Sequence, residues 1–342
     1  MKSRPLVIGI LIFVALAILP LVMDNPYYLD LLILVFLWTS LSSSWNILGG
    51  YTGQVSMGHA AYFGIGAYTM AILGANFGVS PWMALFLGAL SGLPLAFLIG
   101  FICFRLRGPY FVLATIALAE VLRLIALAWR SVTQGAVGLV VPSLFTEKAG
   151  SYYFILTVAA LTILLTMRIA NSKLGFYFAA IREDEDTAES IGINTALFKT
   201  ISLLISAFFT ALVGGFYAAH LGFIEPDIVL SMPISIQIAV TAITGGRGTV
   251  LGPALGSTLL ILAGEAFRSQ FKQAHLLIYG LLLIVVILFM PEGILGEIRR
   301  RIAGRGATPG TRTGTPGAAG PSGRVNPPGA PGALGPQAKE VR

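Results

Sequence analysis

Apolar residues in this chain gather into long stretches that are separated by short polar connections. A helix that crosses the roughly 30 Å hydrocarbon core of a bilayer needs about 20 mostly apolar residues. Ten stretches reach this length, but the third (58–76) is rich in glycine and the eighth (228–245) is interrupted by Pro233. A bundle of eight spans with re-entrant segments therefore fits the pattern as well as one of ten spans. The pattern predicts an all-α, polytopic bundle of about 8–10 transmembrane helices, drawn from segments 6–23, 29–48, 58–76, 82–104, 109–129, 152–169, 200–222, 228–245, 250–267 and 275–290.

Composition supports a lipid environment independently of this pattern. A soluble domain carries about 25% charged residues, whereas 11% of these 342 residues are charged and 56% are hydrophobic. The mean hydropathy is +0.84. A water-soluble fold could not hide so much apolar surface, because the buried fraction saturates at roughly 75%. We therefore interpret residues 1–303 as one transmembrane domain that is surrounded by membrane lipid.

The basic residues predict the orientation. The net charge is +7, and the basic residues stand at the ends of apolar stretches, which is typical of cytoplasmic loops and not of a phosphate-binding face. We therefore expect no nucleic-acid partner. With a cytoplasmic N-terminus, the loop with Arg105 and Arg107, the loop 168–199 and the cluster 299–301 all lie inside. Both termini are then expected in the cytoplasm.

The two ends of the chain differ in character. The opening apolar stretch has about 18 residues, which is longer than the core of a signal peptide, at about 7–15. No small-residue cleavage motif follows it, so we interpret it as a retained first helix. Residues 304–342 are rich in Gly, Pro and Ala and nearly free of large apolar residues. Such a composition predicts a disordered cytoplasmic tail.

Small residues predict close packing inside the bundle. Lipid gives helices no hydrophobic reason to associate, so small residues that allow close approach are used instead. Two glycine-rich turns, 49–55 and 245–250, resemble each other and suggest broken helices or an internal repeat. Three stripes with a spacing of four residues are Gly88, Gly92, Ala96, Gly100, then Ala207, Ala211, Gly215, Ala219, and finally Gly248, Gly252, Gly256.

Ionisable and polar residues inside predicted spans are candidates for function, because each costs a few kcal/mol to insert. Glu120 and Arg123 stand three residues apart on one helix face, so they can either pair with each other or line a path. The candidates for lining a translocation path are Gly53, Gln54, Ser56, His59, Glu120 and Arg123.

The sequence offers no signs of catalysis. It has no nucleophile–base pair, no metal-ligand cluster and no Gly-x4-Gly-Lys-Ser/Thr phosphate loop. Its single cysteine, Cys103, lies in an apolar stretch and cannot form an intramolecular disulfide. We expect no catalytic residue, no metal site and no cofactor on this chain, and therefore no enzyme activity.

The longest charged stretch lies between the sixth and seventh spans, within a cytoplasmic segment at about 172–199. Residues 179–191 contain no proline and are predicted to form one helix, which ends at Gly192. A partly apolar stripe on this helix would suit docking in a groove of a soluble partner. The residues assigned to this contact are Ile181, Arg182, Glu183, Asp184, Glu185, Asp186, Ala188, Glu189, Ile191 and Gly192, with the stripe formed by Ile181, Asp184, Ala188 and Ile191.

Several strings in the chain resemble a known family. Asp186-Thr187-Ala188-x-x-x-Gly192 has the spacing of the Glu-Ala-Ala-x-x-x-Gly loop of ABC importer permeases, with Asp and Thr in place of Glu and Ala. Longer strings are more specific, and together the chain resembles the LivM-type permeases of branched-chain amino acid importers from about residue 46 to 296. These strings are Gly50–Tyr68, Leu106–Phe111, Ala180–Glu185 and Ile278–Gly293.

The resemblance implies a set of partners and a mechanism. The expected partners are a homologous LivH-type permease, two ABC ATPase subunits and an extracytoplasmic substrate-binding protein in a bacterial inner membrane. The cytoplasmic segment would carry the motion of the ATPases into the bundle, which alternates its access. Two alternatives remain open: a related ABC permease for urea, amides or sugars, and an ion-coupled secondary transporter that uses Glu120 and Arg123.

Overall fold

The computed structural model describes residues 3–22, 25–270, 277–278, 280–281, 284, 288 and 293–297. Most of the tenth predicted span, the basic cluster 299–301 and the predicted tail 304–342 lie outside these residues. The division into a membrane domain and a tail therefore stays a prediction.

Helices dominate the described residues, and each of the first nine predicted segments corresponds to one of them. Six of these helices, counted over the described ranges, are long and apolar enough to cross a membrane. The chain is a multi-pass, all-α membrane protein. The long helices are α1 (Ser3–Val22), α2 (Pro26–Asn46), α3 (His59–Phe77), α4 (Pro81–Cys103), α5 (Pro109–Ala128), α7 (Lys148–Ala170), α10 (Thr195–Leu221), α12 (Met232–Gly246) and α13 (Gly252–Gln270).

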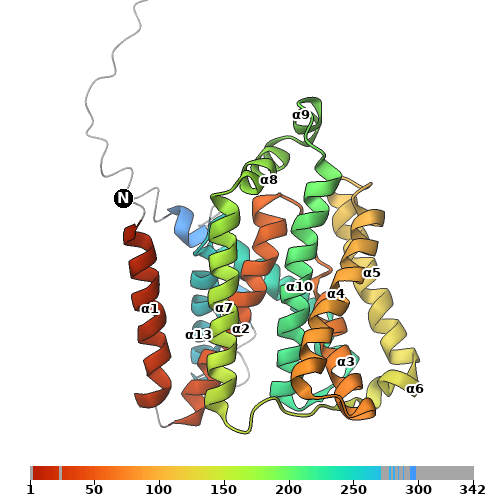
Figure 1. Ribbon diagram of the computed structural model, residues 1–342, viewed down its shortest axis with the longest axis vertical. Coiled ribbons are helices and arrows are strands. Elements are labelled where there is room, and N and C mark those ends of the chain that lie inside the picture. The colour runs from red at the N-terminus through yellow and green to blue at the C-terminus, as the bar shows by residue number, and fades with distance from the viewer. Residues whose placement is uncertain are drawn as a thin grey trace, which may run out of the picture.

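The bundle has two distinct ends (Figure 1). At one end the chain leaves α7 and forms two short helices, α8 (Lys173–Glu183) and α9 (Glu185–Ser190), which lie over the ends of the long helices. We call residues 171–194 the platform and this end the platform end; α1 also begins there.

The opposite end, which we call the far end, is closed by short elements. There β1 (Leu139–Val140) pairs antiparallel with β2 (Phe223–Ile224). Three further short helices lie at this end: α6 (Arg130–Thr133), η2 (Gly135–Val137) and α11 (Pro226–Val229).

Proline begins several helices at a position where it costs nothing. Pro26, Pro81 and Pro109 occupy the first helical position of α2, α4 and α5. The first N–H groups of a helix have no intrahelical acceptor, so the missing proline N–H is not lost there. These prolines set where the chain enters the bundle after each connection.

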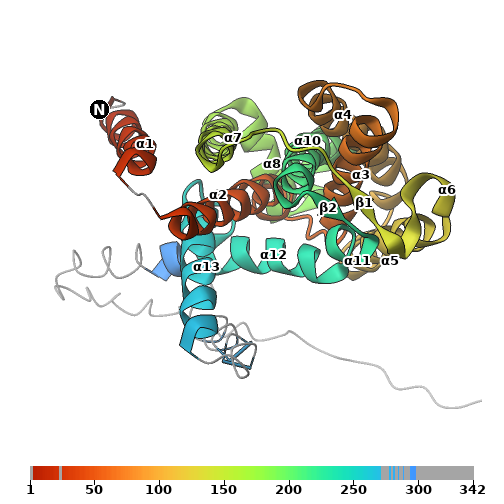
Figure 2. The ribbon, with the colours of Figure 1, turned by 90° about the horizontal axis from the view of Figure 1, so that it is seen from below.

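Helix α10 forms the centre of the bundle, where it packs against α2, α3 and α4 (Figure 2). Small residues bring the backbones together: a Cβ at Gly66 of α3 would overlap the backbone of Ala211, and one at Gly214 would overlap Phe63. The stripes predicted in α4 and α10 lie at buried positions, and the third stripe is buried at Gly252 and Gly256 of α13 and partly buried at Gly248. This arrangement confirms that small residues serve helix packing.

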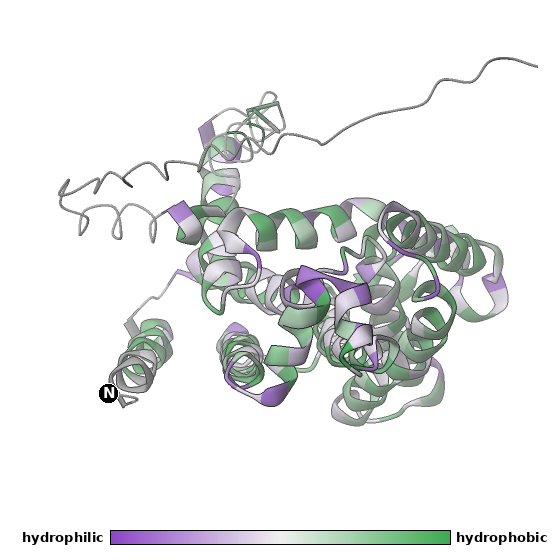
Figure 3. Cartoon of the chain, turned by 90° about the horizontal axis from the view of Figure 1, so that it is seen from above, coloured by the Kyte–Doolittle hydropathy of each residue, from purple (hydrophilic) through white to green (hydrophobic). Residues whose placement is uncertain are grey.

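Buried hydroxyl groups tie the same helices together. Ser44 of α2 lies 3.0 Å from Thr210 of α10, and Thr39 lies 2.5 Å from Ser257 of α13. Outward faces are mostly hydrophobic, whereas hydrophilic residues gather on the platform (Figure 3). Helix α1 lies at the edge of the bundle, where it contacts α7. There the hydroxyl of Tyr152 in α7 donates a hydrogen bond to the carbonyl of Leu16 in α1.

Candidate coupling site

The platform consists of two helices and not of the single helix that the sequence predicts. Asp184 is extended, with φ −159° and ψ 119°, and separates α8 from α9. Its carboxylate accepts a hydrogen bond from the backbone N–H of Thr187 at 2.6 Å and so caps α9. The prediction of one helix was wrong because an aspartate stabilises a helix start more than a helix interior. This N–H also holds the pKa of Asp184 below its ordinary value.

The predicted apolar stripe is therefore also wrong. Ile181 and Ala188 are buried against the protein itself, with 3% and 2% of their surface exposed. Asp184 lies at the break, and only Ile191 points outward, with 70% exposed. Gly192 has a φ of +88°, and the end of the segment at this glycine is confirmed.

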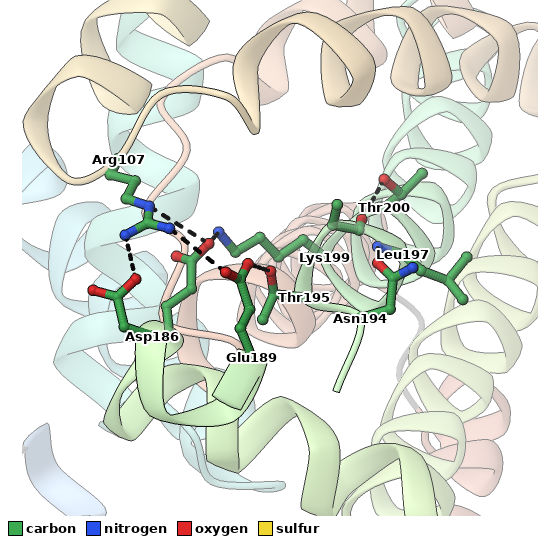
Figure 4. Close-up of polar contacts among 10 residues, drawn as sticks. Arg107, Asp186, Glu189, Asn194, Thr195, Leu197, Lys199 and Thr200 are labelled. Carbon is green, nitrogen blue, oxygen red and sulfur yellow. Dashed lines mark hydrogen bonds and ion pairs between the residues drawn. The ribbon is translucent and has the colours of Figure 1, made fainter. Parts of the chain in front are cut away.

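Arg107, which lies in the connection between α4 and α5, holds α9 on the bundle (Figure 4). The Nη1 atom of Arg107 donates to Asp186 at 2.5 Å. Its guanidinium also lies 4.0 Å from Glu185 and 3.9 Å from Glu189. The hydrogen bond with Asp186 raises the pKa of Arg107 above its ordinary value. The acidic residues of α9 thus face a basic partner within the same chain.

Lys199 forms a second ion pair with α9, and this pair is more buried than those of Arg107. Lys199 is 1% exposed and pairs with Glu185, which is 19% exposed. Glu189 accepts from the Thr195 hydroxyl at 2.5 Å, so α9 also contacts the start of α10. Sequence reasoning missed Lys199, because the seventh span was expected to begin after it. Helix α10 begins at Thr195 instead, which places Lys199 inside the helix.

The outer surface of this region carries three large apolar side chains. Phe176 of α8 is 75% exposed, Ile191 is 70% exposed, and Leu197 at the start of α10 is 52% exposed. Phe176 and Leu197 were not predicted as contact residues, because the sequence does not tell which member of an apolar run points outward. Exposed apolar residues beside acidic ones are typical of a protein-binding surface.

Two glycine turns meet beneath the platform. The first, residues 49–55, begins in the π-helix η1 (Ile47–Tyr51) that continues α2, and the second, residues 245–250, begins with the last two residues of α12. Asn46 joins them: its Nδ2 donates to the carbonyl of Thr249 at 2.8 Å, and its Oδ1 accepts from the N–H of Gly248 at 2.7 Å. The two turns are alike in sequence, and in the structure they lie in contact with each other.

The re-entrant segment 52–58 leads from the first glycine turn back into the bundle. Met57 N–H bonds to Thr115 of α5, and Ala60 N–H, in the first turn of α3 that follows the segment, bonds to Ser235 of α12, so the segment and the start of α3 together lie between these two helices. Gly53 is exposed and Gln54 partly exposed, as a path-lining role requires.

Two of the predicted path residues are enclosed by the chain itself. Ser56 is 1% exposed, and its carbonyl accepts from the Trp45 indole at 2.7 Å. His59 is fully buried, and its Nε2 lies 2.8 Å from Ser206. These contacts place both residues in the packing between helices.

Glu120 and Arg123 form a separate cluster toward the far end. Arg123 bonds to Glu120 at 2.5 Å and also to Asp227 of α11 at 2.5 Å. The structure therefore confirms the ion pair and adds a third member, but it does not bring the pair together with the glycine turns. Within the described ranges, no group of three His, Cys, Asp or Glu residues could hold a metal ion.

A family model described as a branched-chain amino acid transport system permease component matches residues 27–287 of the chain. This range begins with α2 and includes the platform and both glycine turns. The matched region therefore contains the whole of the site described above.

Individual relatives carry matching names. The high-affinity branched-chain amino acid transport system permease protein LivM of Escherichia coli is 27% identical over 80% of this chain and 71% of its own length. The permease protein LivH of Salmonella typhimurium is 26% identical over 75% of this chain and 90% of its own. A probable LivM of Methanocaldococcus jannaschii is 21% identical over 79% and 94%. No solved structure matches the chain.

Proposed function

Because the chain belongs to the family of branched-chain amino acid transport system permease components, we propose that it forms half of a translocation path for branched-chain amino acids. The protein is a multi-pass permease of the bacterial inner membrane. Its relatives include proteins named LivM and proteins named LivH, so a homologous LivH-type permease is the proposed second half. An extracytoplasmic binding protein would deliver the substrate.

The platform end faces the cytoplasm in this proposal. Arg105, Arg107, Arg168 and Lys173 lie in connections or helix ends at this end. Cytoplasmic loops carry an excess of lysine and arginine. Two ATPase subunits would dock on the platform, and hydrolysis of ATP would take place on those partners.

Motion of the platform is the proposed link between ATP hydrolysis and transport. Binding of ATP can shift the bundle between two states only through a difference in the contacts that the ATPases make in each. Helices α8 and α9 supply such a contact, because they lie at the platform end and are fixed to the bundle, α8 by its buried Phe178 and Ile181 and α9 by its ion pairs with Arg107 and Lys199. No covalent chemistry is required of this chain.

The observation that carries the proposal is the exposure of Phe176, Ile191 and Leu197 on the platform end. We expect that Ile191→Asp prevents the ATPase subunits from copurifying with the tagged chain and abolishes uptake, while the chain still inserts. The matched control is Val137→Asp at the far end, which is 76% exposed in the wild type. That variant should retain its ATPases.

The test uses affinity purification of the tagged chain from its native membrane, with mass spectrometry of the copurifying proteins. Recovery of a second permease and of ATPase subunits supports the proposal, and uptake of labelled leucine into proteoliposomes then tests the substrate. Recovery of the folded chain alone, with uptake that a protonophore abolishes, would instead favour a secondary transporter.

A further inference from the structure

Arg182 is a platform residue that reaches both glycine turns, beside Phe178, which packs with Tyr51 of the first turn. It lies in the last turn of α8, with its side chain 39% exposed. Its Nη1 donates to the carbonyl of Gly50 at 3.4 Å, while Nη2 bonds to the neighbouring Glu183 at 3.0 Å. One guanidinium thus contacts both the first glycine turn and the platform's own acidic surface.

Glycine is required where the arginine approaches. A Cβ at Gly53 would lie 2.9 Å from Cγ of Arg182, and a Cβ at Gly248 would lie 2.9 Å from its Nη1. Both glycines also have positive φ angles, +73° and +70°, which other residues rarely adopt. The arginine therefore packs directly on the backbone of both turns.

The two turns are themselves in contact with each other. A Cβ at Gly50 would lie 2.5 Å from the backbone nitrogen of Gly248. With the two hydrogen bonds of Asn46, which is fully buried, this contact makes the ends of α2 and α12 one unit. A displacement of that unit moves both the re-entrant segment 52–58 and the start of α13.

We propose that Arg182 is a positioning residue that transmits the motion of the platform to the paired glycine turns, and thereby to the re-entrant segment between α5 and α12. This inference rests on the proposed function. It assigns the transmission to the contact of Arg182 with the turns and not to its pair with Glu183. Arg107 and Lys199 hold α9, whereas Arg182 connects α8 to the interior.

The test compares ATP hydrolysis with uptake in proteoliposomes that contain the complete transporter and its binding protein. We expect Arg182→Gln to raise the number of ATP molecules hydrolysed per leucine imported about tenfold, within the range that coupling mutations produce. Arg182→Lys keeps a donor for Gly50 but cannot cover both turns, so it should raise the ratio by a smaller factor, about threefold. If Arg182→Gln fails to assemble, Arg182→Lys decides the test.

Two controls separate this contact from other roles of the platform. Glu183→Gln removes the ion-pair partner of Arg182, and Lys173→Gln removes an exposed charge from the same helix. Both residues lie on the docking platform, and weaker docking lowers hydrolysis and uptake together, so each of these variants should raise the ratio by less than Arg182→Lys does. A normal ratio in both Arg182 variants, or an equal rise in Glu183→Gln, would overturn the inference while leaving the proposed function intact. A wild-type complex that imports no branched-chain amino acid would contradict the proposed function itself.

Discussion

The interior of the bundle and the platform are held together by different interactions. Between α2, α3 and α10 the contacts are glycine against backbone and hydroxyl against hydroxyl, as at Gly66 and at Ser44. On the platform they are ion pairs between α9 and the residues Arg107 and Lys199. The interior depends on shape, and the attachment of α9 depends largely on charge, whereas α8 is also held by its buried Phe178 and Ile181.

This difference suits the proposed division of labour. Interactions through van der Waals contact and buried hydrogen bonds leave an interior with few alternative arrangements. The exposed pairs of Arg107 contribute little stability and are screened by salt, so they can break and re-form during a motion, whereas the buried pair of Lys199 with Glu185 is the firmer attachment. A transporter needs a part that keeps its shape and a part that moves. In this chain close packing and buried hydrogen bonds hold the first part, and exposed ion pairs contribute to holding the second.

The largest expected effect is the loss of the fold on changing a glycine of the interior. A side chain at Gly245 would overlap the carbonyl of Gly252 and lie 2.8 Å from the backbone nitrogen of Gly256. Gly245→Leu should therefore cost more than the about 1–3 kcal/mol of ordinary overpacking. We expect aggregated protein in size-exclusion chromatography of the detergent extract.

The matched control for this change is Gly9→Leu in α1, where no atom lies within 4 Å of the added Cβ. That variant should elute as the wild type does. A monodisperse Gly245→Leu protein with wild-type thermal stability would contradict the claim that shape controls the interior.

Lys199 lies at the boundary between the two regions, and its removal should have the next largest effect. Lys199→Met leaves Glu185 with its buried partner missing, and breaking such a pair costs about 3 kcal/mol. We expect a lower unfolding temperature and loss of uptake. The control is Lys148→Met, which breaks the far-end pair with Asp30, where the side chains are 48% and 38% exposed. An exposed pair contributes at most about 1 kcal/mol, so equal shifts in the two variants would contradict the difference in burial.

Much of the fold was predictable because hydrophobicity and small residues act locally. The nine described long helices and the stripes of α4 and α10 follow from sequence periodicity alone. The i, i+3 pair of Glu120 and Arg123 was also predictable, since helical spacing brings the two side chains together.

The errors and omissions concern contacts between distant segments. The break at Asp184 depends on a competition between capping and helix continuation that spacing does not reveal. Arg107 and Asp186 are 79 residues apart, and Asn46 and Gly248 are 202 apart. Such pairs are set by how the helices pack, and a pattern along the chain carries no information about them.

Reversing charges on the platform should have a smaller effect that depends on salt. Arg107→Glu places a carboxylate among Asp186, Glu185 and Glu189, and we expect a few-fold loss of uptake without loss of the fold. Adding Asp186→Arg restores an opposite pair and should recover part of the activity. Uptake by the single variant should also improve at high ionic strength, because screening weakens the repulsion. A double variant as impaired as the single one would show that Arg107 acts through something other than this pairing.

The smallest effect expected is that of acid on the cap of α9. The backbone N–H of Thr187 lowers the pKa of Asp184, so the cap contributes stability above the ordinary aspartate pKa and loses it as the pH falls through the lowered value. The cap at the start of α9 should therefore remain in place from neutral pH down to about pH 4. Asp184→Asn retains a capping oxygen but does not titrate. Hydrogen exchange of the peptide around Thr187 should match in both proteins near neutrality and become faster in the wild type only below about pH 4. A divergence already between about pH 5 and 7, above the ordinary aspartate range, would show that a different group controls the start of α9.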